Sequence, residues 1–292
     1  MDRLPYEVVD VFTDRPFAGN PLAVVFDADG LDAGQLQAVA TEFNLSETVF
    51  VLPPTRPGAT YRARIFTPAI ELPFAGHPSV GAAVTVVTRG LAPPGQVVQE
   101  CGAGLLPLTV YEDGRATLTG GPPTVGPPVD PTPLLATVGL TGADHPGPAP
   151  RAAGCGLEFP FLAVSPGALG VAALDPAAAR SHGVAQVCVV AWDGPQGTAR
   201  VRVFVPGLGV PEDPATGSAA LGLGVWLVTA GLLPGDGGSS YSVRQGAEIG
   251  RPSRLECTVV ATGGAAVSAT VTGGVVPVAS GVIAVPPVAA SG

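Results

Sequence analysis

Two stretches of the chain alternate apolar and polar residues in the same way. One is YRARIFTP, at residues 61–68, and the other is ARVRVFVP, at residues 199–206. Side chains of a β-strand point alternately to its two faces, so this alternation predicts a strand with one buried face. We therefore expect two equivalent strands, one in each half of the chain.

Each predicted strand is followed by a run of small and apolar residues. The runs are PSVGAAVTVVTRG, at residues 78–90, and PATGSAALGLGVWLVTAG, at residues 214–231. Both begin with proline and end with glycine, which is typical of the first turn and the C-terminal end of a helix. Neither run carries a polar stripe, and a helix that is apolar all round has to be surrounded. Each half should therefore wrap strands around a central helix.

The two halves can be aligned as an internal repeat. The matched pairs are Arg62 with Arg200, Arg64 with Arg202, Phe66 with Phe204, Pro68 with Pro206 and, after a two-residue deletion, Pro78 with Pro214 and Gly81 with Gly217. This alignment puts His77 opposite Asp213, so that a histidine and an aspartate would occupy matching positions.

The apolar pattern of the rest of the chain predicts both helices and strands, so the expected fold class is α+β. Residues 31–45, LDAGQLQAVATEFNL, have apolar residues at helical spacing, and most other apolar stretches are short and bounded by glycine and proline, as strands are. We expect two similar domains related by a pseudo-twofold repeat, each a barrel-like mixed sheet around a central apolar helix. The expected boundaries are residues 1–120 for the first domain, 121–133 for a Pro/Gly-rich linker and 134–292 for the second.

The composition argues against several classes of function. The net charge is −9, and all 14 basic residues are arginine. Nucleic acid and anionic membranes need clustered positive charge, so neither is an expected partner. No lysine is present to form a Schiff base. Four separated cysteines and three histidines give little support for a metal site, and we expect no metal and no cofactor.

The sequence also bears on localisation. The first residues lack the basic and apolar segments of a signal peptide, and the longest apolar region is broken by glycine and threonine. Widely spaced cysteines are typical of buried reduced thiols. A cytoplasmic protein is expected.

Candidate chemistry lies at the starts of the two apolar helices. Free backbone N–H groups at a helix N-terminus favour an anion, so two such ends facing across a cleft would suit a small carboxylate. His77 and Asp213 lie in these loops. Other interpretations stay open: Asp213 as a simple helix N-cap, and His77 as an imidazole bonded to a backbone carbonyl.

A third candidate lies in NLSETVFV, at residues 44–51. Glu47 enters an apolar strand there. Desolvation would raise its pKa toward neutrality, as a general acid/base requires. The alternative is an exposed glutamate in a turn.

Five motifs in order now resemble one known family. VDVFTDRPFAGNPLAVV, NLSETVFV, FTPAIELPFAGHPSVGAA, EDPATGSAA and QGAEIGRPS span residues 9–253, and together they are similar to the PhzF-like family of phenazine biosynthesis, within the diaminopimelate epimerase-like fold. The resemblance implies cofactor-independent isomerisation of trans-2,3-dihydro-3-hydroxyanthranilate and a homodimer. It implies Glu47 as the proton shuttle, with His77, Asp213 and Ser218 holding the substrate. It also implies a pocket framed by Asn20, Ser46, Gly76, Thr216 and Gly217. We interpret QGAEIGRPS as a tight β connection rather than a pocket wall.

Two other functions are weighed against this one. Racemases and epimerases of the same fold use two facing thiols, but residues 75–77 and 214–218 contain no cysteine. A protein that only binds a small acid is the second alternative, because a shared fold does not fix function.

Overall fold

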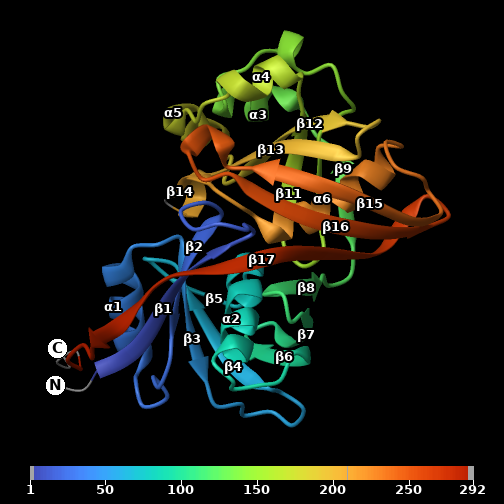
Figure 1. Ribbon diagram of the computed structural model, residues 1–292. Helices are drawn as coiled ribbons and strands as arrows, with labels where there is room; N and C mark the ends of the chain where they lie inside the picture. The colour runs from blue at the N-terminus through green and yellow to red at the C-terminus, as the bar shows by residue number, and fades with distance from the viewer. Residues whose placement is uncertain (1–2, 209, 289–292) are drawn as a thin grey trace. The chain divides into compact units, whose positions relative to one another are not determined.

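The computed structural model describes residues 3–208 and 210–288. The chain forms two compact units, the first from residues before 119 and after 272 and the second from residues 119–272 (Figure 1). We describe each unit by itself.

The first unit is a closed ring of strands. Its elements are β1 (Arg3–Val11), β2 (Asn20–Val25), α1 (Ala33–Phe43), β3 (Glu47–Leu52), β4 (Tyr61–Phe66), β5 (Glu71–Leu72), α2 (Gly76–Thr88), β6 (Gly95–Cys101), β7 (Gly104–Val110), β8 (Arg115–Thr119) and the later part of β17 (Ala265–Ala284). The ring runs β17, β1, β2, β3, β4, β6, β7, β8 and back to β17. Two of its pairings, β2 with β3 and β4 with β6, are parallel, so the sheet is mixed as expected.

Helix α2 lies against the strands of this unit, as Figure 1 shows. All of its residues from Gly76 to Val86 are buried. A Cβ at Gly81 would lie 2.4 Å from Cδ2 of Leu22 and 2.9 Å from Cγ2 of Val11. Only glycine therefore lets the helix approach β1 and β2 this closely. The expectation of a central apolar helix is confirmed here.

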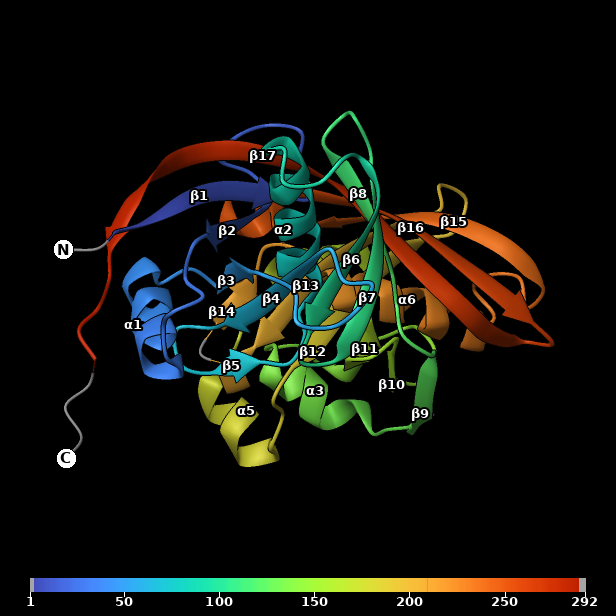
Figure 2. The same ribbon diagram turned by 90° about the horizontal axis from the view of Figure 1, so that it is seen from below.

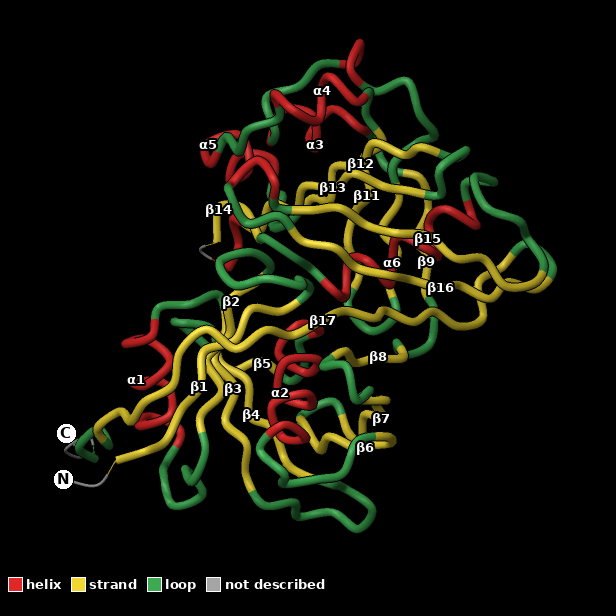
Figure 3. The backbone as a smooth tube through the Cα atoms, in the orientation of Figure 1, coloured by secondary structure: helices red, strands yellow, loops and turns green. Residues whose placement is uncertain are grey.

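The second unit repeats this plan with additions. Its elements are β9 (Thr124–Pro128), α3 (Pro131–Thr137), β10 (Arg151–Gly154), β11 (Glu158–Ala163), α4 (Pro166–Val171), α5 (Pro176–His182), β12 (Val187–Asp193), β13 (Thr198–Val205), β14 (Val210–Asp213), α6 (Gly217–Thr229), β15 (Gly237–Gln245), β16 (Ser253–Thr262), the first part of β17 and the short 3-10 helices Gly142–Asp144, Pro206–Leu208 and Ala247–Ile249. Helix α6 contacts β9, β10, β11 and β16 (Figure 3). Its residues Gly217–Val228 are buried, which confirms the second central helix.

Three short helices of the second unit were not expected from the sequence. Helices α3, α4 and α5 each have proline in the first turn and an N-cap side chain, from Asp130, Ser165 and Asp175 respectively. Figure 2 shows α3 and α5 side by side. The apolar residues of α3 and α4 form a separate core with residues of β11 and β12, and Leu174 and Val184, which flank α5, pack against it. The helices are too short for a clear apolar period, because a helix of two turns presents only two or three buried positions.

The boundaries of the units differ from the expected domains. Strand β17 pairs with β16 through Ala265–Thr272 and with β1 through Val275–Ala284, so the end of the chain returns to the first unit. Residues 121–133, expected as a linker, contain β9, which pairs with β10 of the second unit. No helix in the described part of the chain is long and apolar enough to cross a membrane.

The structure corrects the alignment of the repeat after Pro68. Ile65 pairs with Leu72 in the first unit, and Val203 pairs with Asp213 in the second. Helices α2 and α6 are both 13 residues long, and they begin at Gly76 and Gly217. Asp213 therefore matches Leu72, not His77, because the second half carries an insertion where the alignment placed a deletion. The residue that matches His77 is Ser218, since each is the second residue of its helix.

Candidate active site

Four candidate residues of the first unit meet where two parallel strands and one helix begin. Asn20 is the first residue of β2, Glu47 is the first residue of β3 and Ser46 directly precedes it. His77 is the second residue of α2. Strands β2 and β3 are parallel neighbours, so their first residues lie at the same edge of the sheet.

The side chains of these residues form one polar cluster. Nδ1 of His77 lies 3.2 Å from Oε2 of Glu47 and 3.3 Å from Nδ2 of Asn20. Ser46 Oγ donates to Oδ1 of Asn20 at 2.9 Å. The His77 side chain is 4% exposed and that of Glu47 is 16% exposed. The structure thus brings Asn20, Ser46, Glu47 and His77 together, with Glu47 the most accessible of the two titratable groups.

The orientation of the Asn20 amide favours one tautomer of His77. Because Oδ1 of Asn20 accepts from Ser46, the NH₂ group of Asn20 faces Nδ1 of His77. An amide NH₂ group only donates, so this orientation favours the tautomer in which Nδ1 accepts and the ring proton is on Nε2. A Glu47 carboxyl that has taken up a proton can then donate it in a hydrogen bond to Nδ1, which lies 3.2 Å from its Oε2.

Burial keeps the His77 ring neutral. It lowers the pKa of His77 to about 3, because a charged imidazolium loses its hydration inside the protein, and the Pro21 carbonyl opposes this only in part. Nε2 is buried and makes no hydrogen bond with the described residues. Burial therefore favours a neutral imidazole in this cluster.

The loop before Asn20 is held in an unusual conformation, which the sequence did not single out. Phe17 has a positive φ of 63°, and its backbone N–H donates to Oδ2 of Asp10 at 2.6 Å. Asp10 is 1% exposed. At Gly19, with φ 68°, a Cβ would lie 2.3 Å from the Val11 carbonyl oxygen. Asp10 and Gly19 thus fix the approach of the chain to Asn20, and their place in the motif VDVFTDRPFAGN was the available signal.

The candidates of the second unit lie before and at the start of α6. Asp213 is the last residue of β14, Thr216 is the N-cap of α6, and Gly217 and Ser218 are its first two residues. Thr216 Oγ1 donates to Oδ2 of Asp213 at 2.5 Å. Asp213 is therefore not the N-cap, and the structure excludes that interpretation. Ser218 is buried, as is its counterpart His77.

The remaining candidate of the first unit, Gly76, starts α2 with no side chain capping the helix. Its N-cap is Ala75, and Thr216 at the matching position of α6 also makes no capping bond to the helix. The first N–H groups of both helices are therefore not satisfied by a cap side chain, which leaves them suited to an anionic group of a ligand.

The repeat does not extend to the titratable groups. Thr48 pairs with Phe66 in the first unit and Val187 pairs with Phe204 in the second, so the counterpart of Glu47 is Gln186. A glutamine cannot take up or release a proton at ordinary pH. The titratable pair of Glu47 and His77 is therefore matched in the second unit by Gln186 and Ser218, neither of which titrates at ordinary pH.

The three buried thiols do not suit proton transfer. All four cysteines are free, and Cys155, Cys188 and Cys257 are buried. Burial raises the pKa of Cys155 to about 11, and it raises the pKa of Cys188 and Cys257 further. The described residues include no group of His, Cys, Asp and Glu side chains that could hold a metal ion.

Comparison with known proteins identifies the family. The family described as phenazine biosynthesis-like protein (PhzC-PhzF) matches residues 9–281. An uncharacterized isomerase of Mesorhizobium japonicum is 38% identical over 94% of this chain and 97% of its own length. The trans-2,3-dihydro-3-hydroxyanthranilate isomerase of Pseudomonas aeruginosa is 36% identical over 86% of this chain and 88% of its own.

A solved structure agrees with this assignment. The crystal structure of a PhzF-family phenazine biosynthesis protein from Bacillus anthracis is 25% identical, with a TM-score of 0.86 over 97% of this chain and 100% of the other. The expected diaminopimelate epimerase-like α+β fold and the resemblance drawn from the five motifs are both confirmed. The chain belongs to the phenazine biosynthesis-like PhzF family and is an enzyme of the isomerase class.

Proposed function

We propose that this isomerase moves a proton between two carbons of a small cyclic or amino-acid-like carboxylate by general acid/base catalysis, without a cofactor. The Pseudomonas aeruginosa relative, named for trans-2,3-dihydro-3-hydroxyanthranilate, supports a substrate of this type. The observation that carries the proposal is the 3.2 Å contact between the Glu47 carboxyl and the neutral, buried ring of His77. A partly accessible carboxyl held at fixed geometry is suited to exchanging protons with a bound substrate.

In this proposal Glu47 takes a proton from one carbon and returns it to another. The electron pair of the broken C–H bond shifts the adjacent double bond, and the Glu47 carboxyl, whose proton exchanges with solvent, supplies the proton of the new C–H bond, so no further reactant is needed. While Glu47 holds the proton, its O–H donates to Nδ1 of His77. Asn20 keeps that nitrogen available as an acceptor. The ring need not become charged at any stage.

The remaining candidates would bind the substrate. We assign to His77, Asp213 and Ser218 the polar contacts that orient it, and to Gly76, Thr216 and Gly217 contacts through the backbone at the two helix starts. Ordered groups at such positions raise the rate by fixing the reacting atoms against Glu47. The buried state of His77, Thr216 and Ser218 supports this assignment, because their side chains have few rotamers to lose on binding.

A proton NMR time course in deuterated buffer tests the proposal. Trans-2,3-dihydro-3-hydroxyanthranilate is incubated with the wild type, with Glu47→Gln and with Glu42→Gln, a control in which an exposed glutamate of α1 is changed in the same way. We expect conversion with deuterium at carbon in the wild type and in Glu42→Gln. Glu47→Gln should be slower by at least about 100-fold, as for loss of a general acid/base.

Each other outcome has a definite meaning. Equal rates in Glu47→Gln and the wild type would remove Glu47 from the mechanism. No exchange in the wild type, despite saturable binding of the compound, would leave a protein that only binds small acids. Exchange that persists in Glu47→Gln and disappears on thiol alkylation would favour a two-thiol racemase.

A further inference from the structure

The motif at residues 245–253 holds the loop that carries Asp213. Gln245, the last residue of β15, contacts both ends of this loop, at Asp213 and Thr216. Ser253 Oγ donates to the Pro214 carbonyl oxygen at 2.8 Å. Gly246, with φ 76°, lies so close that a Cβ there would be 2.5 Å from the same oxygen. The segment is a β connection, as expected, and it is also a clamp on residues 213–216.

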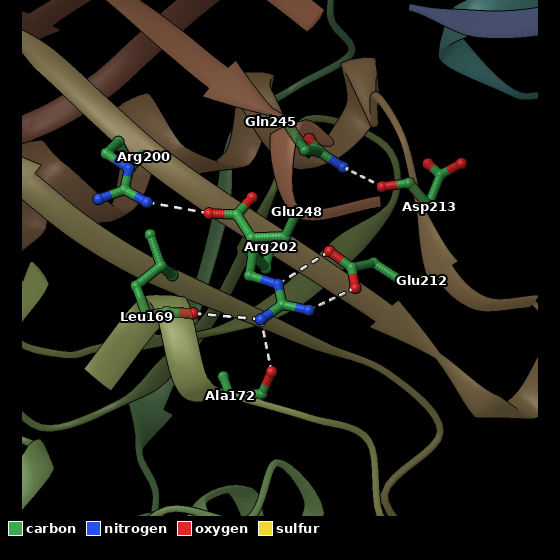
Figure 4. A network of polar contacts seen from close by, with 8 residues as sticks. All are labelled: Leu169, Ala172, Arg200, Arg202, Glu212, Asp213, Gln245 and Glu248. Atoms are coloured by element: carbon green, nitrogen blue, oxygen red, sulfur yellow. Dashed lines mark hydrogen bonds and ion pairs between the residues drawn. The ribbon is translucent and has the colours of Figure 1, made fainter. Parts of the chain in front are cut away.

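The register of the sheet explains why Gln245 reaches this loop. Strand β13 lies between β14 and β15, with Val203 paired with Asp213 and Val201 paired with Gln245. Both strands therefore end beside the same part of β13. Figure 4 shows the Gln245 amide directed at the backbone of Asp213.

The amide of Gln245 has one possible orientation. The Thr216 backbone N–H is only a donor, and it lies 3.2 Å from Oε1 of Gln245, so that atom is the oxygen. The NH₂ group then donates to the Asp213 carbonyl oxygen at 2.7 Å and to Thr216 Oγ1 at 2.9 Å. Gln245 is 2% exposed. Every polar atom of its side chain is thus committed to this loop.

The hydroxyl of Thr216 forms hydrogen bonds with both Gln245 and Asp213. Thr216 Oγ1 accepts from Gln245, and its single hydrogen points to Oδ2 of Asp213 at 2.5 Å. Oδ2 must therefore accept, which requires that this oxygen carry no proton. Hydrogen bonds run in one direction from amide to hydroxyl to carboxylate.

We propose that Gln245 is a positioning residue which, through the Thr216 hydroxyl, holds Asp213 as an oriented hydrogen-bond acceptor for a donor group of the substrate. The role in substrate binding rests on the proposed function, whereas the control of Asp213 by Gln245 does not. It follows that the substrate presents an N–H or O–H group to Asp213, since a second acceptor there would be repelled.

Substitutions at Gln245 and Thr216 test the chain of hydrogen bonds. In Gln245→Glu one oxygen still accepts from Thr216 N–H, but the other can only accept, so the Thr216 hydroxyl turns to it and leaves Asp213. Thr216→Val removes the hydroxyl, and Thr216→Ser keeps it. Gln96→Glu is the matched control, because Gln96 also donates to a threonine hydroxyl, that of Thr109 at 2.8 Å, but on the exposed face of β6.

The first readout does not depend on catalysis. Carbon-detected NMR follows the titration of the Asp213 carboxyl in each folded variant. A hydrogen bond donated to the carboxylate favours its charged form, so its loss should raise the titration midpoint by about one pH unit in Gln245→Glu and Thr216→Val. Thr216→Ser and Gln96→Glu should titrate as the wild type does.

The surrounding charges are the same in the wild type, Thr216→Val and Thr216→Ser. They are Arg200 and Arg202 of β13, Glu212 of β14, Glu248 of the connection, and Arg251. Gln245→Glu adds a negative charge beside Asp213 that raises the midpoint by itself, so the difference between the two Thr216 variants is the one that reports the hydrogen-bond chain. An unchanged midpoint in Thr216→Val would overturn the proposal, and this variant remains decisive if Gln245→Glu does not fold.

The second readout is the turnover of the variants. The acidic limb of the profile of kcat/KM against pH should move in Gln245→Glu and Thr216→Val in the same direction as the titration, with Thr216→Ser restoring it. A shifted titration in an enzyme without turnover would contradict the proposed function and leave the positioning role intact. A wild-type titration with loss of turnover would contradict the positioning role alone.

Discussion

Arg202 holds Glu212 through two parallel hydrogen bonds, from Nε at 2.9 Å and from Nη2 at 2.6 Å, and both side chains are 9% exposed. Nη1 of Arg202 also donates to the carbonyl oxygens of Leu169, at 3.2 Å, and Ala172, where α4 ends. The guanidinium therefore joins β13, β14 and α4. Its pKa is raised, above all by the hydrogen bonds to Glu212.

The repeat supplies a natural control for this pair. Arg64 and Glu71 make the same two bonds in the first unit, at 2.8 and 2.7 Å, but their side chains are 25% and 40% exposed. We expect Glu212→Gln to lower the free energy of unfolding by about 3–5 kcal/mol, because it leaves a buried guanidinium without its counter-ion. Glu71→Gln should cost about 1 kcal/mol or less. Urea unfolding of both variants measures this, and equal losses would contradict the role of burial.

Because the pKa of His77 is low in the folded protein, the free energy of unfolding should decrease as the pH decreases. The unfolded chain binds a proton at His77 near pH 6.5, while the folded chain stays neutral until about pH 3. The unfolded state therefore binds more protons between these values, and stability is lost as the pH falls below about 6.5. The wild type should lose about 2 kcal/mol more than His77→Gln between pH 7 and pH 5.

Urea unfolding at several pH values checks this difference. Comparison with His77→Gln removes the contribution of the carboxyl groups, which titrate in both proteins. Parallel curves for the two proteins would show that His77 takes up its proton in the folded state as readily as in the unfolded chain.

The central helices were predictable because their signal is local. An apolar run without a polar stripe requires burial wherever it lies, so α2 and α6 followed from their own residues. The residues at which these helices begin were not predicted correctly. Pro214 lies in the loop before α6, not in its first turn, since Thr216 is the N-cap. Matching prolines could not locate the gap in the alignment of the two halves, because proline occurs both in loops and in the first turn of a helix.

The roles of Gln245 and β17 depend on distant contacts. Nothing around Gln245 in the sequence shows that its amide reaches Thr216, because the two are joined only by the pairing of β14 and β15 with β13. The alternation along β17 predicts a strand but not its partner. Candidate residues were recognisable from motifs, whereas the matching of His77 with Ser218 became visible only in the structure.

Close packing at Gly81 should make this position sensitive to a single methyl group. A Cβ there would overlap Leu22 and Val11, so Gly81→Ala should lower the free energy of unfolding by about 1–3 kcal/mol. Gly170, in α4, has no atom within 4 Å of such a Cβ. Gly170→Ala should be neutral or stabilise by up to about 1 kcal/mol, because alanine restricts the unfolded chain. Thermal unfolding of both variants tests this, and a neutral Gly81→Ala would mean that α2 can shift away from β1 and β2.

The tautomer of His77 is the most direct test of the first-unit cluster. The chain has three histidines, and Nδ1 of His145 lies 2.6 Å from the Ala163 carbonyl oxygen. A carbonyl only accepts, so His145 carries its proton on Nδ1 and serves as an internal reference. We expect nitrogen chemical shifts of the opposite type for His77, with the proton on Nε2.

A change at Asn20 should reverse this tautomer. In Asn20→Asp the group facing Nδ1 can only accept, so the His77 proton should move to Nδ1 and the shifts should come to resemble those of His145. Glu47 would then lose its acceptor at Nδ1, and proton exchange into the substrate should slow by at least about tenfold. If His77 already resembles His145 in the wild type, Nδ1 donates to an ionised Glu47, and Asn20 does not set the protonation of the cluster.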